Sequence, residues 1–283
     1  MCSVWGENVK KSREVGFIKR AVWTKALDEM GSWPVQVNLD IHGAGEPLLH
    51  PDFFDILAYA KEKGNISVGF LCNATLLDEK KAEAVVRLGT DWVGFSVDGA
   101  QKEVFEYYRR GAVLAEVEKN IEKLIALRQH GKPSILLNMV GHSEASSELF
   151  IQRWEGKVDT LQLSRKRPVE REENKRILLK KPCPLPFQQL VMGWNGYTVL
   201  CCEDCWGDYI IGKFPEERLY DIWHCKVVER ARMLHRKAKS GKIRLCSHCD
   251  SGIFHNYSEM TRENTLVKVE LNSINPAYGS LKD

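Results

Sequence analysis

Apolar and polar positions follow a regular series of strand and helix patterns along the first 164 residues. The series opens with helical spacing over Phe17–Met30, and short apolar runs then alternate with segments whose apolar residues recur every three or four positions. The apolar runs predict strands over Val35–Ile41, Ile66–Leu71, Trp92–Val97, Ser134–Val140 and Val158–Leu163. The helical spacings predict helices over Phe53–Lys63, Asp78–Leu88, Lys102–Arg109, Leu114–His130 and Ser146–Trp154.

Alternation of strands and helices predicts an α/β fold with parallel strands and right-handed crossovers. The strands are continuous apolar runs, as expected when helices cover the sheet. The series begins on a helix and not on a strand, so the array starts halfway through a strand–helix unit.

The pattern changes after residue 164. Charges of both signs crowd residues 165–182, which we interpret as a linker. From Cys183 the chain is rich in Cys, Trp, Gly and Pro, and Asn195–Gly196 predicts a hairpin between strands at Leu190–Trp194 and Tyr197–Leu200. A helix is expected over Leu219–Leu234. The sequence thus predicts domains at 1–164 and 183–256 and a loosely ordered tail at 257–283.

Composition narrows the functional classes. The net charge of +3 over 283 residues indicates neither a nucleic-acid partner nor an anionic membrane surface. No run approaches the roughly 18 apolar residues of a membrane span, and residues 1–8 lack the apolar core of a signal peptide. We therefore expect a cytoplasmic protein with reduced thiols. Seven of its nine cysteines lie in the last third, which favours a metal site over disulfides.

The segment Ile41–Asp52 is the first candidate for chemistry. It follows a predicted strand and precedes a helix for which Pro51 suits the first position. Gly43 and Gly45 let a ligand approach the backbone closely, and Glu46 and Pro47 follow them. Backbone amides there suit a carboxylate, while Glu46 and backbone carbonyls suit an ammonium group. A tight turn with a solvated Glu46 is the alternative.

The cysteines of the last third form two candidate pairs. The predicted hairpin brings Cys183 and Cys201 near each other, and the C-x-x-C spacing brings Cys246 and Cys249 together. Four thiolates suit either a [4Fe–4S] cluster or tetrahedral zinc. A pairing of Cys202-x-x-Cys205 with Cys246-x-x-Cys249 would resemble a zinc ribbon, although its separation is longer than usual.

Several motifs together resemble the radical S-adenosylmethionine (SAM) superfamily, in its branch with a C-terminal SPASM or shorter twitch domain. The segment G-A-G-E-P-L-L-H-P-D-F resembles the family's GGEP-type loop, L-C-N-A-T-L-L its T-N-G-T-L-L strand end, and F-S-V-D-G-A its S-I-D-G strand end. The segments E-Y-Y-R-R-G, C-P-L-P-F-Q-Q-L-V-M-G-W-N-G-Y-T-V-L-C-C, L-Y-D-I-W and C-S-H-C extend the match over roughly residues 1–250.

The resemblance implies a partial (β/α)6 TIM-like barrel that lacks its first strand, followed by a small Cys-rich domain. It implies SAM and a SAM-binding [4Fe–4S] cluster as cofactors, together with an auxiliary [4Fe–4S] cluster. The SAM contacts carried over by motif are Gly43, Gly45, Glu46, Pro47, Asn73, Ser96, Asp98 and Asn138. The metal ligands carried over are Cys2 for the SAM cluster and Cys183, Cys201, Cys246 and Cys249 for the auxiliary cluster, with Cys202 as the alternative to Cys201.

The chain departs from the family at its start. Of the three cysteines in the family's C-x-x-x-C-x-x-C motif only Cys2 is present, so this chain is not expected to hold the SAM cluster. We interpret Met1 as an internal methionine, which predicts an in-frame C-x-x-x-C-x upstream in the coding DNA.

The leading functional hypothesis is a radical SAM oxidoreductase or maturase. It would generate a 5′-deoxyadenosyl radical and abstract hydrogen from an unknown small-molecule or peptide substrate. Flavodoxin or ferredoxin would supply electrons, and Arg165 is a candidate substrate contact. A catalytically degenerate radical SAM-like protein and a zinc-stabilised α/β binding protein are the alternatives.

Overall fold

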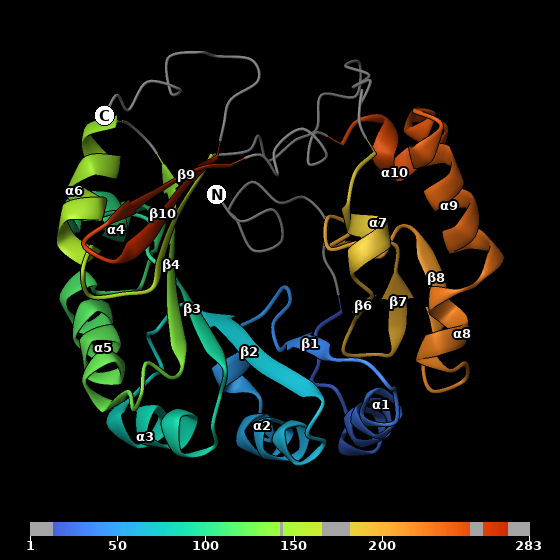
Figure 1. The fold of residues 1–283 in the computed structure, drawn as a ribbon, viewed down its shortest axis with the longest axis horizontal. Coiled ribbons are helices and arrows are strands. Elements are labelled where there is room, and N and C mark those ends of the chain that lie inside the picture. Colours follow the sequence, from blue (N-terminus) through green and yellow to red (C-terminus); the bar gives the residue numbers. More distant parts are fainter. Residues whose placement is uncertain (1–13, 142–143, 166–181, 250–256, 271–283) are drawn as a thin grey trace. The chain divides into compact units, whose positions relative to one another are not determined.

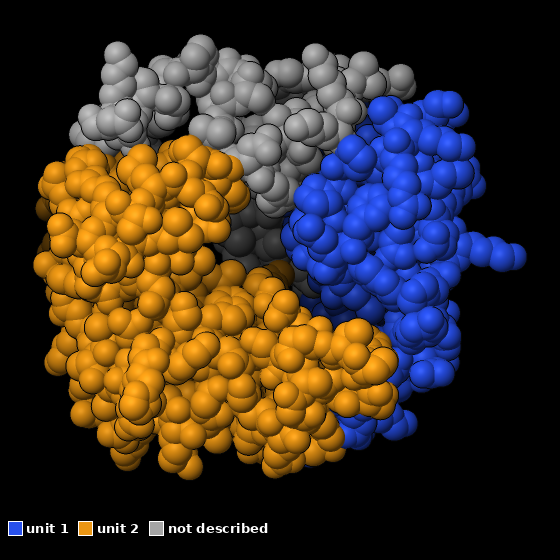
Figure 2. All heavy atoms as spheres, in the orientation of Figure 1, with its two compact units in different colours: residues 1–29, 167–256 blue, residues 30–166, 257–283 orange. Residues whose placement is uncertain are grey.

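The computed structural model describes residues 14–141, 144–165, 182–249 and 257–270. The chain divides into two compact units, which Figure 2 colours separately. Unit 1 comprises residues 1–29 and 167–256, and unit 2 comprises residues 30–166 and 257–283. The predicted linker lies almost entirely outside the described residues.

Unit 2 is built on a seven-stranded sheet with the order β1-β2-β3-β4-β5-β10-β9. Strands β1 to β5 are parallel and adjacent in chain order, which confirms the predicted α/β array (Figure 1). These strands span Val37–Asp40, Ile66–Cys72, Trp92–Ser96, Ser134–Gly141 and Thr160–Arg165. The helices that connect them are α2 (Phe53–Glu62), α3 (Glu79–Arg87), α4 (Lys102–Tyr108), α5 (Leu114–Leu127) and α6 (Glu144–Trp154).

The helices pack on one face of this sheet and bury it. On α2, Phe53 lies edge-on to Phe70 of β2, with 4.8 Å between ring centroids. The predicted apolar face of α5 is buried at Leu114, Val117, Ile121 and Leu124. Burying each such side chain contributes roughly 1.5–3 kcal/mol, so this layer stabilises unit 2 substantially. The opposite face carries half-buried and polar side chains, which leaves it available for a site.

Two carboxylates bind the sheet together where its strands begin. Asp91, directly before β3, accepts the backbone N–H of Val68 on β2 and the ammonium of Lys61. Asp159, directly before β5, accepts the N–H of Ile135 on β4 and pairs with the guanidinium of Arg128. Each carboxylate satisfies a strand N–H that the ladder leaves open, which fixes the register at this end of the sheet.

The first turn of α2 differs from the prediction. Pro51 was expected at the first helical position, but α2 begins at Phe53, with Asp52 in the N-cap position. A 3-10 turn, η1 (Pro47–Leu49), precedes it. The imidazole Nδ1 of His50 accepts the Asp52 N–H, and this bond holds the chain outside helical geometry for one more turn.

The predicted tail is wrong for residues 257–270. Strands β9 (Tyr257–Arg262) and β10 (Thr265–Glu270) form a hairpin, and β10 pairs in parallel with β5. The turn places Glu263 and Asn264 at positive φ, a conformation that the sequence pattern did not reveal. Sequence reasoning missed these strands because their stability comes from pairing with a strand about 100 residues earlier in the chain.

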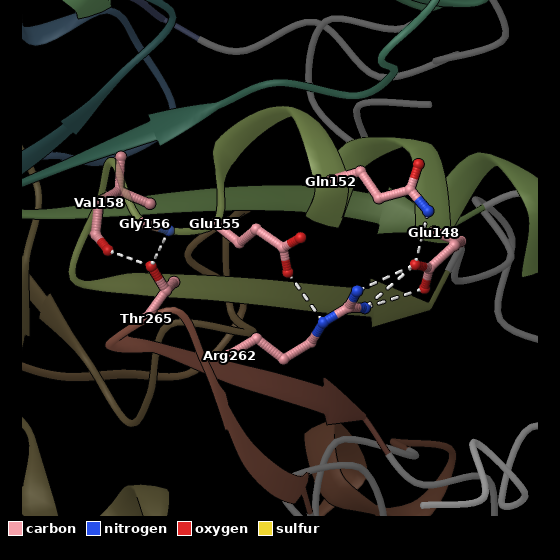
Figure 3. A network of polar contacts seen from close by, with 7 residues as sticks. All are labelled: Glu148, Gln152, Glu155, Gly156, Val158, Arg262 and Thr265. Atoms are coloured by element: carbon pink, nitrogen blue, oxygen red, sulfur yellow. Dashed lines mark hydrogen bonds and ion pairs between the residues drawn. The ribbon is translucent and has the colours of Figure 1, made fainter.

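Arg262 anchors this hairpin to α6, as Figure 3 shows. Its guanidinium donates to both carboxylate oxygens of Glu148 and lies 2.8 Å from a carboxylate oxygen of Glu155. In the same turn, the Thr265 hydroxyl donates to the Val158 carbonyl at 2.7 Å. Planar guanidinium groups bind carboxylates in this forked geometry, which makes the contact specific.

Unit 1 contains a small antiparallel sheet of β6 (Val191–Met192), β7 (Tyr197–Val199) and β8 (Ile210–Lys213). The predicted hairpin around Gly196 is therefore present, and β8 is an addition that the sequence pattern did not reveal. The helices are α1 (Arg20–Gly31), most of which belongs to this unit, α7 (Leu185–Gln188), α8 (Leu219–Trp223), α9 (Lys226–Arg236) and α10 (Arg244–Ser247), with a 3-10 turn η2 (Ser240–Lys242).

The helix predicted over Leu219–Leu234 is in fact two helices. Cys225 has an extended backbone, with φ −67° and ψ 155°, and separates α8 from α9. Its thiol donates to the Ile211 carbonyl on β8, which holds the break against the sheet. Hydrophobic spacing continues through this point, so only the tertiary contact reveals it.

We predict that Arg262→Ala releases the β9–β10 hairpin. Losing two charge-assisted contacts on partly exposed groups should lower local stability by about 1–2 kcal/mol. Amide hydrogen exchange over residues 257–270 should then quicken roughly 5- to 30-fold, since 1.4 kcal/mol corresponds to a factor of ten. Lys123→Ala, which removes an exposed ion pair with Glu79, is the control and should leave that exchange unchanged. Equal protection in Arg262→Ala would contradict the anchoring role.

Candidate functional site

The glycine loop of unit 2 lies between β1 and η1 and is tied to the end of β2 by Glu46. One carboxylate oxygen of Glu46 accepts the Leu48 N–H at 3.2 Å, and the other accepts the Asn73 N–H at 3.0 Å. Pro47 is the first residue of η1. The carboxylate thus holds its own loop against the next strand end, which leaves loop backbone groups to meet a ligand.

Gly43 and Gly45 are not required by packing within the protein. A Cβ built at either position would meet no atom within 4 Å, and neither residue has a positive φ. Space beside the backbone is therefore open at both positions. Such a strip of backbone fits a small zwitterion such as the methionine part of SAM, whose close approach a side chain would hinder.

Asn73 shapes the end of β2. Its side-chain oxygen accepts the backbone N–H and the hydroxyl of Thr75, at 2.9 and 2.7 Å, which forms a turn. Ala74 has φ 61°, and the resembling family motif carries glycine at this place, where positive φ is easiest. Asn120 donates to the Ala74 carbonyl and supports the turn from α5.

Asp98 is fully buried just past β3. One of its carboxylate oxygens accepts the Val140 N–H on β4 at 2.9 Å, and the other lies 2.6 Å from Nε of Arg109. Because both oxygens are already engaged, Asp98 acts within the protein and positions Arg109. The positive charge of Arg109 also lowers the pKa of Glu46, so these two groups lie within electrostatic reach of each other.

Ser96, Asn138 and Gln162 lie side by side across β3, β4 and β5. Their backbone positions pair directly, which puts the three side chains on one face of the sheet. The Asn138 side-chain oxygen accepts the Ser164 hydroxyl at 2.8 Å and the Gln162 amide at 3.4 Å. With that oxygen engaged, Asn138 presents its amide nitrogen as a donor on the face away from the helices.

Sequence reasoning missed two members of this polar face, Gln162 and Ser164, and it also missed Arg109, which pairs with Asp98. Gln162 and Ser164 alternate with buried Leu161 and Leu163, so a strict reading of the strand period would have found them. Arg109 follows a helix, and only the fold brings it to Asp98.

Burial raises the pKa of Glu46 above its ordinary value. Its two backbone donors and Arg109 oppose this effect but do not cancel it. A carboxyl with a raised pKa binds more protons in the folded than in the unfolded chain, and this links the glycine loop to pH.

The cysteines of unit 1 divide by burial. Cys183, Cys201 and Cys246 are 7, 6 and 8 % exposed, and Cys249 is partly buried. Cys202 is exposed, and its sulfur accepts the Gln189 amide at 3.2 Å. Of the two alternative ligands, Cys201 is therefore buried and Cys202 is exposed.

Electrostatic interactions connect these thiols. Burial raises the pKa of Cys201, and the charges of Cys202, Cys246 and Cys249 raise it further. Burial likewise raises the pKa of Cys183, with a contribution from Cys249. Among the described residues, no three potential ligands converge as one metal ion requires. Cysteine sulfurs are the donors that hold [4Fe–4S] clusters, so the residue types present fit such a group.

Gly196 and Asp204 build the frame of Cys201. Gly196 has φ 81°, and a Cβ there would lie 2.1 Å from the Phe214 carbonyl oxygen, so only glycine permits the hairpin turn. Both carboxylate oxygens of Asp204 accept backbone N–H groups, from Asp208 and Tyr209. The glycine five positions before Cys201 is thus explained by backbone geometry.

Other predicted positions lie outside this picture. Cys2 is not among the described residues, and the side chain of Arg165 is likewise not described. Cys72 is a buried core residue of β2. In the described part of the chain, every helix is too short or too polar to cross a membrane.

Comparisons with known proteins agree with both units. A model of the radical SAM superfamily matches residues 1–149, and a model of SPASM, an iron–sulfur cluster-binding domain, matches residues 183–250. These domains imply SAM and [4Fe–4S] clusters as cofactors.

Three curated proteins show the range of relatives. A tungsten-containing aldehyde ferredoxin oxidoreductase cofactor-modifying protein from Pyrococcus furiosus is 32 % identical over 142 residues, which cover 48 % of this chain and 39 % of that protein. The PqqA peptide cyclase of Gluconobacter oxydans is 26 % identical over 144 residues, covering 50 % of this chain and 38 % of that protein. The matches thus span less than half the length of these two relatives. An S-adenosyl-L-methionine-dependent 2-deoxy-scyllo-inosamine dehydrogenase from Niallia circulans is 21 % identical, covering 88 % of this chain and 87 % of that protein.

Solved structures share the fold. BtrN in complex with AdoMet and 2-DOIA superposes with a TM-score of 0.59 and 18 % identity, covering 88 % of this chain and 87 % of that one. Native anSMEcpe with bound AdoMet gives a TM-score of 0.64 and 14 % identity, covering 79 % and 76 %.

We predict that Glu46→Gln destabilises unit 2 in a pH-dependent way. One accepting oxygen becomes an NH2 group that faces a backbone N–H, at a cost of about 1–3 kcal/mol. Because the pKa of Glu46 is raised on folding, its stabilising contribution is largest below the ordinary carboxyl pKa of 4.5 and falls as pH rises through the folded-state pKa. Urea unfolding of both proteins should therefore show a stability difference that narrows from pH 4.5 to pH 7.5.

The exposed substitution Glu79→Gln serves as the control and should change stability by about 0.5 kcal/mol or less. A difference between wild type and Glu46→Gln that widens with rising pH would contradict the raised pKa.

Proposed function

Because the chain belongs to the radical SAM superfamily, we propose that its unit 2 binds SAM and its unit 1 holds an auxiliary [4Fe–4S] cluster in a hydrogen-abstracting oxidoreductase. SAM at a reduced cluster supplies a 5′-deoxyadenosyl radical, which removes a hydrogen atom from the substrate. The protein residues bind, orient and shield this chemistry.

The glycine loop binds the methionine end of SAM in this proposal. Open space beside Gly43 and Gly45 admits the ligand, and loop carbonyls accept its ammonium group. Glu46 serves by fixing the loop through the N–H groups of Leu48 and Asn73. This differs from a direct contact between Glu46 and the ammonium, because both carboxylate oxygens already accept backbone donors.

The polar face of β3, β4 and β5 binds the rest of SAM or the substrate. Ser96 offers a hydroxyl and Asn138 an amide donor, both on the side of the sheet that the helices leave open. Gln162 and Ser164 hold the Asn138 amide in one orientation. Fixed donors of this kind cost little reorganisation when a ligand with hydroxyl or ring acceptors binds. Asp98 supports the same end of the sheet by accepting the Val140 N–H.

The observation that carries the proposal is the group of buried thiols in unit 1. Cys183, Cys201 and Cys246 are buried. Burial raises the pKa of Cys183 and Cys201, and neighbouring cysteines, among them Cys249, raise it further. Iron would oppose this rise, since thiolates are stabilised by a bound metal. Four protein thiolates would leave the cluster no open iron for SAM, so its role is electron transfer or shaping of the pocket.

Dehydrogenation of a small hydroxylated substrate is the reaction we favour. The relative that aligns with nearly the whole chain is named as a dehydrogenase of 2-deoxy-scyllo-inosamine. Removing a hydrogen atom from a carbinol leaves a radical that must still lose one electron and one proton, and a closed cluster suits the uptake of that electron. A small flavodoxin or ferredoxin would supply the electron that starts the reaction.

We predict that Cys201→Ala loses the auxiliary cluster and Cys202→Ala keeps it. Purification without oxygen and reconstitution with iron and sulfide should give about four irons per chain in wild type and Cys202→Ala, and much less in Cys201→Ala. The pair is matched, because the two substitutions are identical and adjacent. Equal iron in both variants would contradict the ligand assignment. A colourless, zinc-loaded wild type would reject the iron–sulfur proposal altogether.

We further predict that SAM is cleaved reductively. Protein extended at its start so that Cys2 completes the family's C-x-x-x-C-x-x-C motif should release 5′-deoxyadenosine with SAM and dithionite. Gly43→Val should reduce this release at least tenfold, since the side chain fills the space beside the loop. 2-Deoxy-scyllo-inosamine is the first substrate to test, with deuterium at the oxidised carbon traced into 5′-deoxyadenosine. Absence of 5′-deoxyadenosine from protein with a full cluster would overturn the proposed activity.

A further inference from the structure

His235 is a buried histidine next to two of the proposed cluster ligands. It lies on α9 and is only 2 % exposed. Its Nδ1 lies 3.4 Å from the backbone N of Cys183, and its Nε2 lies 3.5 Å from the sulfur of Cys246. The ring thus bridges the first and third of the four proposed ligands, and no motif in the sequence marks it for that place.

The contact with Cys183 fixes the tautomer of this ring. The Cys183 backbone N–H is a donor only, so Nδ1 must accept and cannot carry a proton. The ring proton then lies on Nε2, the nitrogen that faces the Cys246 sulfur. An N–H directed at a sulfur in a water-poor environment is a hydrogen-bond donor to that sulfur.

Neighbouring contacts hold α9 in the orientation that this geometry needs. One helical turn earlier, Arg232 donates from Nε to the Pro186 carbonyl at 2.9 Å and from Nη1 to the Trp223 carbonyl at 3.0 Å. Its guanidinium also lies 3.9 Å from the centroid of the Trp223 ring. The helix is thereby fixed against the segment that follows Cys183, and His235 on the same face is held towards the thiols.

We propose that His235 is a positioning residue of the auxiliary cluster: its Nε2–H donates a hydrogen bond to the Cys246 thiolate and makes the cluster easier to reduce. The physical reason is charge. Uptake of one electron adds negative charge to the cluster and its thiolates, and a donor to a ligand sulfur stabilises that state more than the oxidised one. This inference rests on the proposed auxiliary cluster and gives that cluster a bias towards accepting electrons.

Two substitutions separate the two ends of the ring. In His235→Asn the side-chain oxygen reaches the position of Nδ1 and can still accept the Cys183 N–H, but the side chain does not reach Cys246. Glutamine reaches the position of Nε2 and can donate to Cys246. His224→Asn is the matched control, because His224 is an exposed histidine of the same unit, bonded to the Tyr220 carbonyl.

The experiment is a redox titration of the reconstituted 283-residue chain, followed by electron paramagnetic resonance. We expect the midpoint potential of the cluster to become more negative in His235→Asn, to return towards the wild-type value in His235→Gln and to stay unchanged in His224→Asn. Iron and sulfide content are measured on each sample. An unchanged potential in fully loaded His235→Asn would overturn the inference while leaving the proposed cluster intact.

A measurement on wild type covers the case in which His235→Asn does not load iron. Protein labelled with 15N-histidine should show, in the electron spin echo modulation of the reduced cluster, a histidine nitrogen coupling that loaded His235→Gln lacks, whereas His248 between Cys246 and Cys249 contributes equally to both samples. The coupling should persist in His224→Asn. A loaded wild type without that coupling contradicts the role of His235, whereas a wild type that binds no iron–sulfur cluster contradicts the proposed function itself.

Discussion

Carboxylates that accept a backbone N–H from the neighbouring strand are the interaction on which the sheet of unit 2 depends. Asp91 and Asp159 do this where strands begin, and Glu46 and Asp98 do it where strands end. Each one satisfies a donor that the parallel ladder leaves open, and a buried unpaired N–H would be costly. The two that lie at the carboxyl ends have a second effect: they fix the loops that any ligand at this edge must contact.

These backbone contacts leave the carboxylates little capacity to bind a ligand or to catalyse a reaction. Glu46 and Asp98 look like catalytic or binding carboxylates in the sequence, yet every oxygen of both accepts a donor from the protein. In the proposed function, ligand binding is therefore assigned to the loop backbone beside Gly43 and Gly45, the Asn138 amide and the Ser96 hydroxyl. A site of this composition suits a cofactor that brings its own reactivity.

Unit 1 is organised around buried thiols that suit a positively charged metal group. Burial raises the pKa of Cys183 and Cys201, and a bound metal group would favour their thiolate forms. The frame around them is rigid for simple reasons: Gly196 allows a turn that no other residue fits, and Asp204 binds two backbone donors of the following loop. His235 completes the surroundings from α9. A cluster bound at these thiols would therefore stabilise the fold of this unit.

The sequence by itself determined the alternating strands and helices, the parallel class of the sheet and the buried helix faces, because hydrophobic period acts locally. It located the glycine loop, and the family resemblance favoured Cys201 with Cys202 as the alternative. It could not find the β9–β10 hairpin or the break at Cys225 that separates α8 from α9, since each depends on contacts between distant segments. Only the tertiary structure decided that Glu46 and Asp98 accept backbone N–H groups, that Arg109 pairs with Asp98, that Gln162 and Ser164 share one polar face with Asn138, and that His235 lies against Cys246. The reason is physical: a local pattern fixes which face of an element is buried, while the partner of each polar atom is fixed only when the elements pack together.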